Sequence, residues 1–193
     1  MKTLMNITVS AISLFFIMAF ADISVNKQVK LNKTLKSKEV VIPKIIPEVT
    51  TIPPISDMEL FLHSIGERES SNRYDVVNSY GYMGKYQFGK ATLRGLGYRV
   101  TQEEFLNSPD LQEKAMLDLL QHNKNKLSKY IEKYDCSFLN GIYITESGIL
   151  AAAHLAGPGN VKKFFKRGRD FHDGYGTSMT SYMIKFSGYK LFI

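Results

Sequence analysis

The residue best placed to do chemistry is Glu69, which follows a run with helical periodicity. A capping box formed by Ser56 and Glu59 predicts where this helix begins. Its apolar residues recur at helical spacing, at Met58, Phe61, Leu62 and Ile65. At about 100° per residue, Glu69 lies about 20° from the direction of Met58, whereas Glu67 lies about 180° away. We therefore expect Glu69 to extend the buried stripe and Glu67 to face solvent.

A carboxyl in that position could act as a general acid. Burial disfavours the charged form of a carboxyl and therefore raises its pKa. A glutamate that keeps its proton near neutral pH can donate it during catalysis. The alternative is a structural carboxylate that accepts hydrogen bonds from nearby backbone N–H groups or pairs with Arg68. Helical periodicity alone leaves both interpretations open.

The residues that follow Glu69 favour catalysis. The segment Arg68-Glu69-Ser70-Ser71-Asn72 continues to Asn78-x-x-Gly81-Tyr82-Met83-Gly84-Lys85-Tyr86-Gln87-Phe88 and then Thr92. This pattern resembles the lysozyme-like lytic transglycosylases and the related resuscitation-promoting factors. In those families a Glu-Ser pair ends a helix, and a glycine-rich loop with a Gly-x-x-Gln motif lines the sugar cleft.

Two further segments extend the resemblance over about residues 60–186. The segment Ala151-Ala152-Ala153-His154-Leu155-Ala156-Gly157-Pro158-Gly159 resembles the family's Ala-Ala-Tyr-Asn-Ala-Gly-Pro-Gly sequence. The segment Thr180-Ser181-Tyr182 resembles a less specific Thr-x-x-Tyr pattern on a late helix. Two pairs depart from the family pattern: its Tyr-Asn is His154-Leu155 here, and its Leu-Met before the glutamine is Lys85-Tyr86. The first departure removes any contact from that asparagine.

The resemblance implies a role for each matching residue. Glu69 would be the catalytic acid, Gln87 would hydrogen-bond an N-acetyl sugar, and Tyr182 would lie near the catalytic carboxyl. The loop 84–87 would form one wall of the cleft. The substrate-binding residues expected on this basis are Ser70, Gly84, Tyr86, Gln87, His154, Ala156, Gly157 and Tyr182.

The resemblance also implies a reaction, cleavage of the β-1,4 bond between N-acetylmuramic acid and N-acetylglucosamine in peptidoglycan. Glu69 would protonate the glycosidic oxygen and then take a proton from the sugar's own 6-hydroxyl, leaving a 1,6-anhydro product. A hydrolase would need a second carboxylate to orient water, and Asp75 and Asp173 are the candidates, although no motif marks either. A third possibility, favoured by the His154-Leu155 departure, is a module that binds the wall without cutting it.

Tyrosines must supply the flat surfaces on which sugars stack, because the chain has 11 tyrosines and no tryptophan. We expect Tyr86 and Tyr182 to lie in the cleft. At least one tyrosine of the matched segments is expected in the core with its hydroxyl hydrogen-bonded. The candidates are Tyr80, Tyr82, Tyr86 and Tyr182.

The chain divides into three segments. Residues 1–21 combine Lys2, an apolar run and the small-x-small sequence Ala19-Phe20-Ala21, which predicts a cleavable export signal or else an uncleaved anchor. Residues 22–56 hold four of the six prolines and none of the 14 glycines, which predicts an extended tether. Residues 57–193 are predicted to be one mainly α domain of α+β, lysozyme-like type. We therefore expect an exported protein, periplasmic or associated with the cell wall.

The predicted domain is built from helices and one irregular segment. Helices are expected from Ser56, from Ser108 to about Tyr134, over about 146–156, over 161–165 and over 178–186. A break is expected at Gly157-Pro158-Gly159. Residues 78–89 lack helical periodicity and are predicted to form a loop or small hairpin that lines a sugar-binding cleft.

Composition narrows the possible partners. The formal charge of +7 is expected to favour an anionic cell envelope, and the export signal disfavours nucleic acid. A single cysteine, Cys136, excludes an internal disulfide. The four histidines show no paired metal-ligand spacing and no glycine cluster matches a nucleotide motif, so no metal or cofactor is expected. We expect a monomer that binds a glycan strand and contacts a membrane only through an uncleaved signal.

Overall fold

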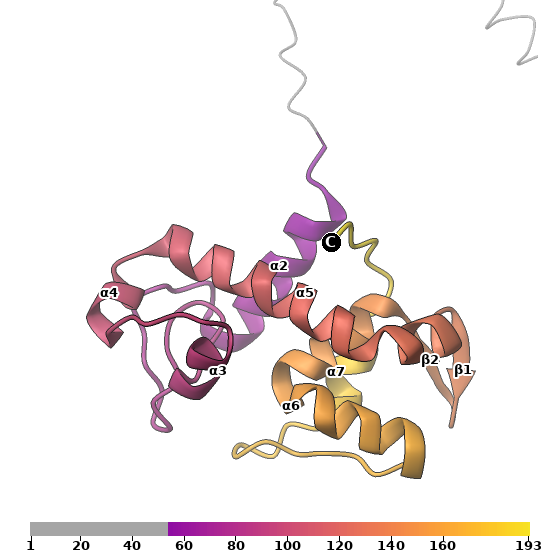
Figure 1. Cartoon of the computed structure of the whole chain (residues 1–193). Helices are drawn as coiled ribbons and strands as arrows, with labels where there is room; N and C mark the ends of the chain where they lie inside the picture. Colours follow the sequence, from indigo (N-terminus) through magenta and orange to yellow (C-terminus); the bar gives the residue numbers. More distant parts are fainter. Residues whose placement is uncertain (1–53) are drawn as a thin grey trace, which may run out of the picture. The chain divides into compact units, whose positions relative to one another are not determined.

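The computed structural model describes residues 54–193, which form a mainly helical domain (Figure 1). The predicted signal and most of the predicted tether lie outside the described residues, and residues 54–56 are exposed. In this part of the chain, no helix combines the length and apolarity that crossing a membrane requires. The elements in chain order are α2 (Asp57–Ser70), α3 (Lys90–Gly95), α4 (Gln102–Leu106), α5 (Pro109–Tyr134), β1 (Ser137–Leu139), β2 (Ile142–Ile144), α6 (Glu146–Arg167) and α7 (Met179–Lys185).

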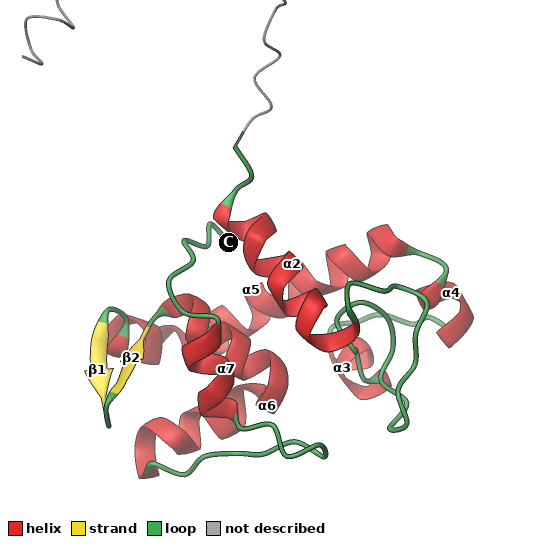
Figure 2. Ribbon diagram, turned by 180° about the vertical axis from the view of Figure 1, so that it is seen from behind, coloured by secondary structure: helices red, strands yellow, loops and turns green. Residues whose placement is uncertain are grey.

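The long helix α5 runs across the domain. Figures 1 and 2 show α3, α4 and the loop that follows α2 near one end of it, and the antiparallel β1–β2 hairpin near the other. Helix α6 packs against both α5 and α7. Residues 149–153 of α6 are buried, and three of them are alanines, whose small side chains allow close helix packing. Large fully buried side chains include Phe61, Ile65, Met116, Leu120, Leu127 and Ile149.

Capping residues begin the helices where the sequence predicts them. The Ser56 hydroxyl accepts a hydrogen bond from the Glu59 backbone N–H, and the Glu59 carboxylate accepts one from the Ser56 N–H. Pro109 is the first residue of α5, a position whose N–H would have no partner within the helix. The predicted helices over 146–156 and 178–186 are present as α6 and α7. The short helices α3 and α4 and the hairpin were not predicted.

Helix α6 is interrupted at the predicted break. Gly157 has φ 74° and ψ 155°, which is not a helical conformation, and Pro158 has no N–H to donate. Helical structure then resumes and continues to Arg167. The break therefore turns the middle of α6, which places Ala156 and Gly157 at the wall of a pocket.

A buried amide on α5 fixes the loop over residues 74–88. Gln112 is 0% exposed, and its Oε1 accepts a hydrogen bond from the Lys85 N–H at 2.9 Å. Its Nε2 donates to the carbonyl oxygens of Tyr74 at 3.0 Å and Phe105 at 2.8 Å. Gly84 has φ 71°, and a Cβ atom there would overlap the Gln112 side chain. The loop therefore needs a glycine at this position, and its isolated bridges confirm the predicted loop or small hairpin.

We expect Gly84→Ala to lower the free energy of unfolding by about 2–3 kcal/mol, because the new Cβ meets Gln112 and the positive φ is strained for alanine. Thermal or urea denaturation measures the change. Gly95→Ala is the matched control, since no atom lies within 4 Å of a Cβ built at Gly95 in α3. Equal stability of the two variants would show that Gln112 does not constrain the loop.

Candidate functional site

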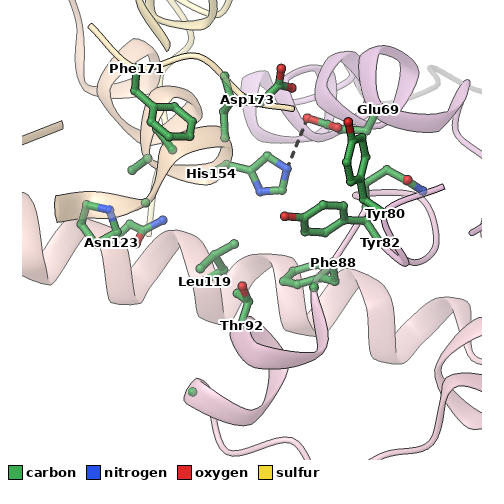
Figure 3. Close-up of a pocket in the computed structure, with 18 of the residues that line it drawn as sticks. Glu69, Tyr80, Tyr82, Phe88, Thr92, Leu119, Asn123, His154, Phe171 and Asp173 are labelled. Carbon is green, nitrogen blue, oxygen red and sulfur yellow. Dashed lines mark ion pairs between the residues drawn. The ribbon is translucent and has the colours of Figure 1, made fainter. Parts of the chain in front are cut away.

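A pocket of about 570 Å³ opens among the helices. Its lining comes from the end of α2, the loop that follows α2, α3, α5, the break in α6 and the loop that follows α6. Figure 3 shows labelled side chains from these segments converging on the pocket, with His154 near the centre of the view. Helices far apart in the sequence therefore contribute to a single site.

Glu69 lies in the pocket wall in the last turn of α2. Its side chain is 15% exposed, whereas Glu67 is exposed. The helix ends at the next residue, Ser70, and the residue that caps it, Ser71, has φ 55°. The predicted inward direction of Glu69 and outward direction of Glu67 are thus confirmed.

Two side chains hold the Glu69 carboxylate. The Tyr182 hydroxyl donates a hydrogen bond of 2.6 Å to Glu69 Oε1. The His154 Nε2 lies 3.5 Å from the same oxygen, and this contact is the dashed line in Figure 3. The carboxylate is therefore fixed by residues from α7 and α6.

The prediction that Glu69 has a raised pKa is wrong. Burial pushes this pKa upward, but the hydrogen bond and positive charge of His154, the hydrogen bond from Tyr182 and the charge of Arg68 outweigh it. The net pKa of Glu69 lies below its ordinary value. The carboxyl is consequently ionised at neutral pH in the free protein.

Tyr182 holds the carboxylate but offers no surface for stacking. It is 3% exposed and does not line the pocket, so the prediction of a stacking role in the cleft is wrong. Burial, and then the charge and hydrogen bond of Glu69, raise the pKa of Tyr182 far above its ordinary value. The phenol therefore keeps its proton and donates a hydrogen bond to Glu69.

Of the other predicted substrate-binding residues, Gln87, His154, Ala156 and Gly157 line the pocket. Gln87 has φ 49°, an uncommon conformation for a residue other than glycine, and its Nε2 donates to the Gly84 carbonyl at 2.8 Å. Backbone strain of this kind is concentrated at functional sites. The Oε1 acceptor and the second Nε2 hydrogen of Gln87 remain for a ligand.

Ser70, Gly84 and Tyr86 do not line the pocket, so a direct substrate contact for them is not supported. The Ser70 hydroxyl donates to the Lys85 carbonyl at 2.8 Å and ties the loop to the end of α2. Tyr86 is 0% exposed and its hydroxyl donates to Glu113 Oε2 at 2.6 Å. The expectation that Tyr86 lies in the cleft is wrong, because it packs on the side of the loop that faces α5.

Three exposed tyrosines line the pocket: Tyr80 and Tyr82, which were among the candidates, and Tyr175, which the sequence did not single out. The rings of Tyr80 and Tyr175 meet edge to face with centroids 4.9 Å apart. The Tyr175 hydroxyl lies 2.8 Å from the Ser79 hydroxyl, and the Tyr80 hydroxyl donates to the Gly174 carbonyl at 3.1 Å. The loops after α2 and α6 therefore touch at the pocket.

One of the two candidate second carboxylates reaches the pocket. Asp173 lines it, and its Oδ1 accepts hydrogen bonds from the N–H groups of Tyr175 at 2.9 Å and Thr177 at 2.7 Å. Asp75 does not line the pocket and pairs at 3.5 Å with Arg73 in an exposed position.

Comparison with known proteins does not assign the site. No protein-family model matches the chain, and no curated protein matches it. Over residues 54–193, no group of three or more His, Cys, Asp and Glu side chains is arranged to hold a metal ion. The function is therefore inferred from the residues and geometry of the pocket.

We expect His154→Gln to raise the pKa of Glu69, because the substitution removes the positive charge that favours the ionised carboxyl. A ¹³C NMR titration of the Glu69 carboxyl carbon measures this pKa directly. His63→Gln is the control, since His63 is exposed on α2, the helix that carries Glu69, and does not line the pocket. If Glu69 titrates at the same pH in all three proteins, His154 does not stabilise the carboxylate.

Proposed function

We propose that this chain is an exported enzyme with a lysozyme-like fold that cuts the β-1,4 bond between N-acetylmuramic acid and N-acetylglucosamine in peptidoglycan. The observation that carries the proposal is the Glu69 carboxyl, fixed at the end of α2 in a pocket whose wall includes exposed tyrosines and Gln87. These residues follow the order of the sequence pattern that resembles the lytic transglycosylases. No metal, cofactor or nucleic acid enters the proposed reaction.

In the proposed reaction Glu69 acts first as an acid and then as a base. Protonated Glu69 gives its proton to the glycosidic oxygen as the bond from that oxygen to C1 of the muramic sugar breaks. The acetamido group of the substrate stabilises the positive charge that develops at C1. The sugar's 6-hydroxyl oxygen then bonds to C1 while its proton returns to Glu69, so a 1,6-anhydro ring forms and no water is consumed.

The first step requires protonated Glu69, and in this proposal substrate binding raises the pKa of Glu69 so that the carboxyl takes up a proton. The free carboxyl is ionised because His154, Tyr182 and Arg68 outweigh the effect of burial. A sugar seated in the pocket removes the remaining water around the carboxyl, and desolvation favours its neutral form. Binding is therefore coupled to uptake of a proton by Glu69.

The pocket offers both kinds of contact that a sugar needs. The exposed rings of Tyr80 and Tyr82 provide flat apolar surfaces in place of tryptophan. Gln87 Oε1 can accept a hydrogen bond from the N–H of an N-acetyl group, while one Nε2 hydrogen stays bonded to the Gly84 carbonyl.

The hydrolytic alternative is favoured by one observation, the presence of Asp173 in the same pocket as Glu69. A second carboxylate could orient a water molecule for attack on C1. The non-catalytic alternative is favoured by another, the lowered pKa of Glu69 beside His154. These alternatives differ in whether products form and in their mass.

We expect the purified protein to release 1,6-anhydro muropeptides from peptidoglycan, and we expect Glu69→Gln to lower this rate by about 10²- to 10⁴-fold because it removes the acid. Mass spectrometry of the soluble products measures both. Glu67→Gln on the exposed face of α2 is the control and should retain the rate. Products heavier by one water would identify a hydrolase, and binding without release would identify a wall-binding module.

We expect Asp173→Asn to leave the product unchanged and the rate within about tenfold of the original, because the transglycosylase reaction uses one carboxyl. The asparagine keeps an Oδ1 acceptor for the N–H groups of Tyr175 and Thr177, so the loop is preserved. Asp75→Asn, at an exposed position, is the control. A collapse of activity in Asp173→Asn alone would show that the second carboxylate is required.

A further inference from the structure

A buried amide in the pocket wall makes no hydrogen bond. Asn123 of α5 is 0% exposed and lines the pocket, yet neither its Oδ1 nor its Nδ2 has a partner. Buried side-chain amides are almost always hydrogen-bonded, because leaving donors and acceptors unpaired away from water lowers stability. Asn123 is therefore an exception that calls for a physical reason.

The same helix shows how this fold satisfies an amide that serves structure. Gln112 is also 0% exposed, and its two polar atoms make three hydrogen bonds to backbone groups. Asn123 lies farther along α5 and makes none. Its amide is thus not part of the scaffold that holds the loops together.

The position of Asn123 connects it to the site. In Figure 3 it lies on the opposite side of His154 from Glu69, with Leu119 and Phe171 labelled nearby. Over residues 54–193, four buried side-chain atoms have neither a hydrogen-bond nor an ion-pair partner, and three of them belong to the pocket-lining residues Asn123 and His154. Unpaired polar capacity is therefore concentrated at this part of the pocket.

We propose that Asn123 is a specificity-determining residue that binds a secondary amide of the substrate, at the part of the pocket beyond His154. A carboxamide offers one acceptor and two donors, and a secondary amide offers the complementary C=O and N–H. The neighbouring cation Lys124 does not line the pocket, and it is engaged with Glu146 at 2.8 Å and with the Ile193 carbonyl at 2.9 Å.

This inference rests on the proposed function, because peptidoglycan supplies secondary amides from two sources. One is the acetamido group on each sugar, and the other is the peptide bond of the stem attached to muramic acid. Both present the same C=O and N–H pair. The experiment below distinguishes between them.

The test compares two proteins, the Glu69→Gln variant and the double variant Glu69→Gln, Asn123→Leu. The first substitution slows turnover, so that binding can be measured. Leucine has the branched shape of asparagine without its polar atoms. The probes are acetylated glycan strands without stems, the same strands after de-N-acetylation, and acetylated strands that carry stems, each titrated by calorimetry. We expect Asn123→Leu to weaken binding of at least one amide-bearing probe about tenfold while leaving the de-N-acetylated strand unaffected.

The pattern of loss identifies the source of the amide. Weaker binding of both acetylated probes assigns the acetamido group, and weaker binding of the stem-bearing probe alone assigns the peptide. Equal affinities of the two proteins for every probe would overturn the inference, while cleavage by the parent enzyme would leave the proposed function standing. Absence of binding to any probe, together with absence of cleavage, would overturn both.

Stability separates a binding role from a structural one. We expect Asn123→Leu to leave the melting temperature unchanged or higher, because it removes an unpaired buried amide. Gln112→Leu should lower the melting temperature by about 10 °C, because three hydrogen bonds are lost. Asn123→Ala provides a second variant that adds no atoms to the wall and should show the same pattern of binding. A Tm loss in Asn123→Leu as large as that in Gln112→Leu would show a structural role and overturn the inference.

Discussion

The hydrogen bond from Tyr182 to Glu69 is the contact on which the pocket depends. It joins the first and last helices of the described domain, and it holds one carboxylate oxygen at a fixed place in the wall. His154 of α6 approaches the same oxygen. Because the three residues come from three helices, the position of the carboxylate depends on how these helices are placed in the domain.

A second set of contacts supports the loop that presents Gln87. Lys85 and Tyr86 stand where the sequence pattern that this chain resembles has an apolar pair, and here both bind Glu113 of α5, at 2.7 and 2.6 Å. Burial acts to raise the pKa of Glu113, but hydrogen bonds from Lys85, Tyr74 and Tyr86 outweigh it and lower the net pKa. The loop that presents Gln87 is therefore attached to the core through polar contacts on its hidden side. The departure from the pattern alters how the loop is held and leaves the pocket-facing glutamine in place.

Helical periodicity and capping chemistry were sufficient to predict α2, α5, the interrupted α6 and the inward direction of Glu69. The loop over 78–89 has no period, so the sequence could not show that Tyr86 points inward while Tyr80 and Tyr82 point toward the pocket. The pKa of Glu69 depends on His154 and Tyr182, which are distant in the sequence. The capping box of Thr101 and Glu104 could have revealed α4, and the unpaired amide of Asn123 becomes visible only when its surroundings are known.

The lowered pKa of Glu69 has a consequence for the energetics of the whole domain. A carboxyl that is more acidic in the folded chain than in the unfolded chain stabilises folding above its unfolded pKa, and this contribution is lost as the pH falls through the folded value. That window lies on the acidic side of an ordinary glutamate. As long as the pH stays above that window, the contribution of Glu69 to folding stability is therefore retained.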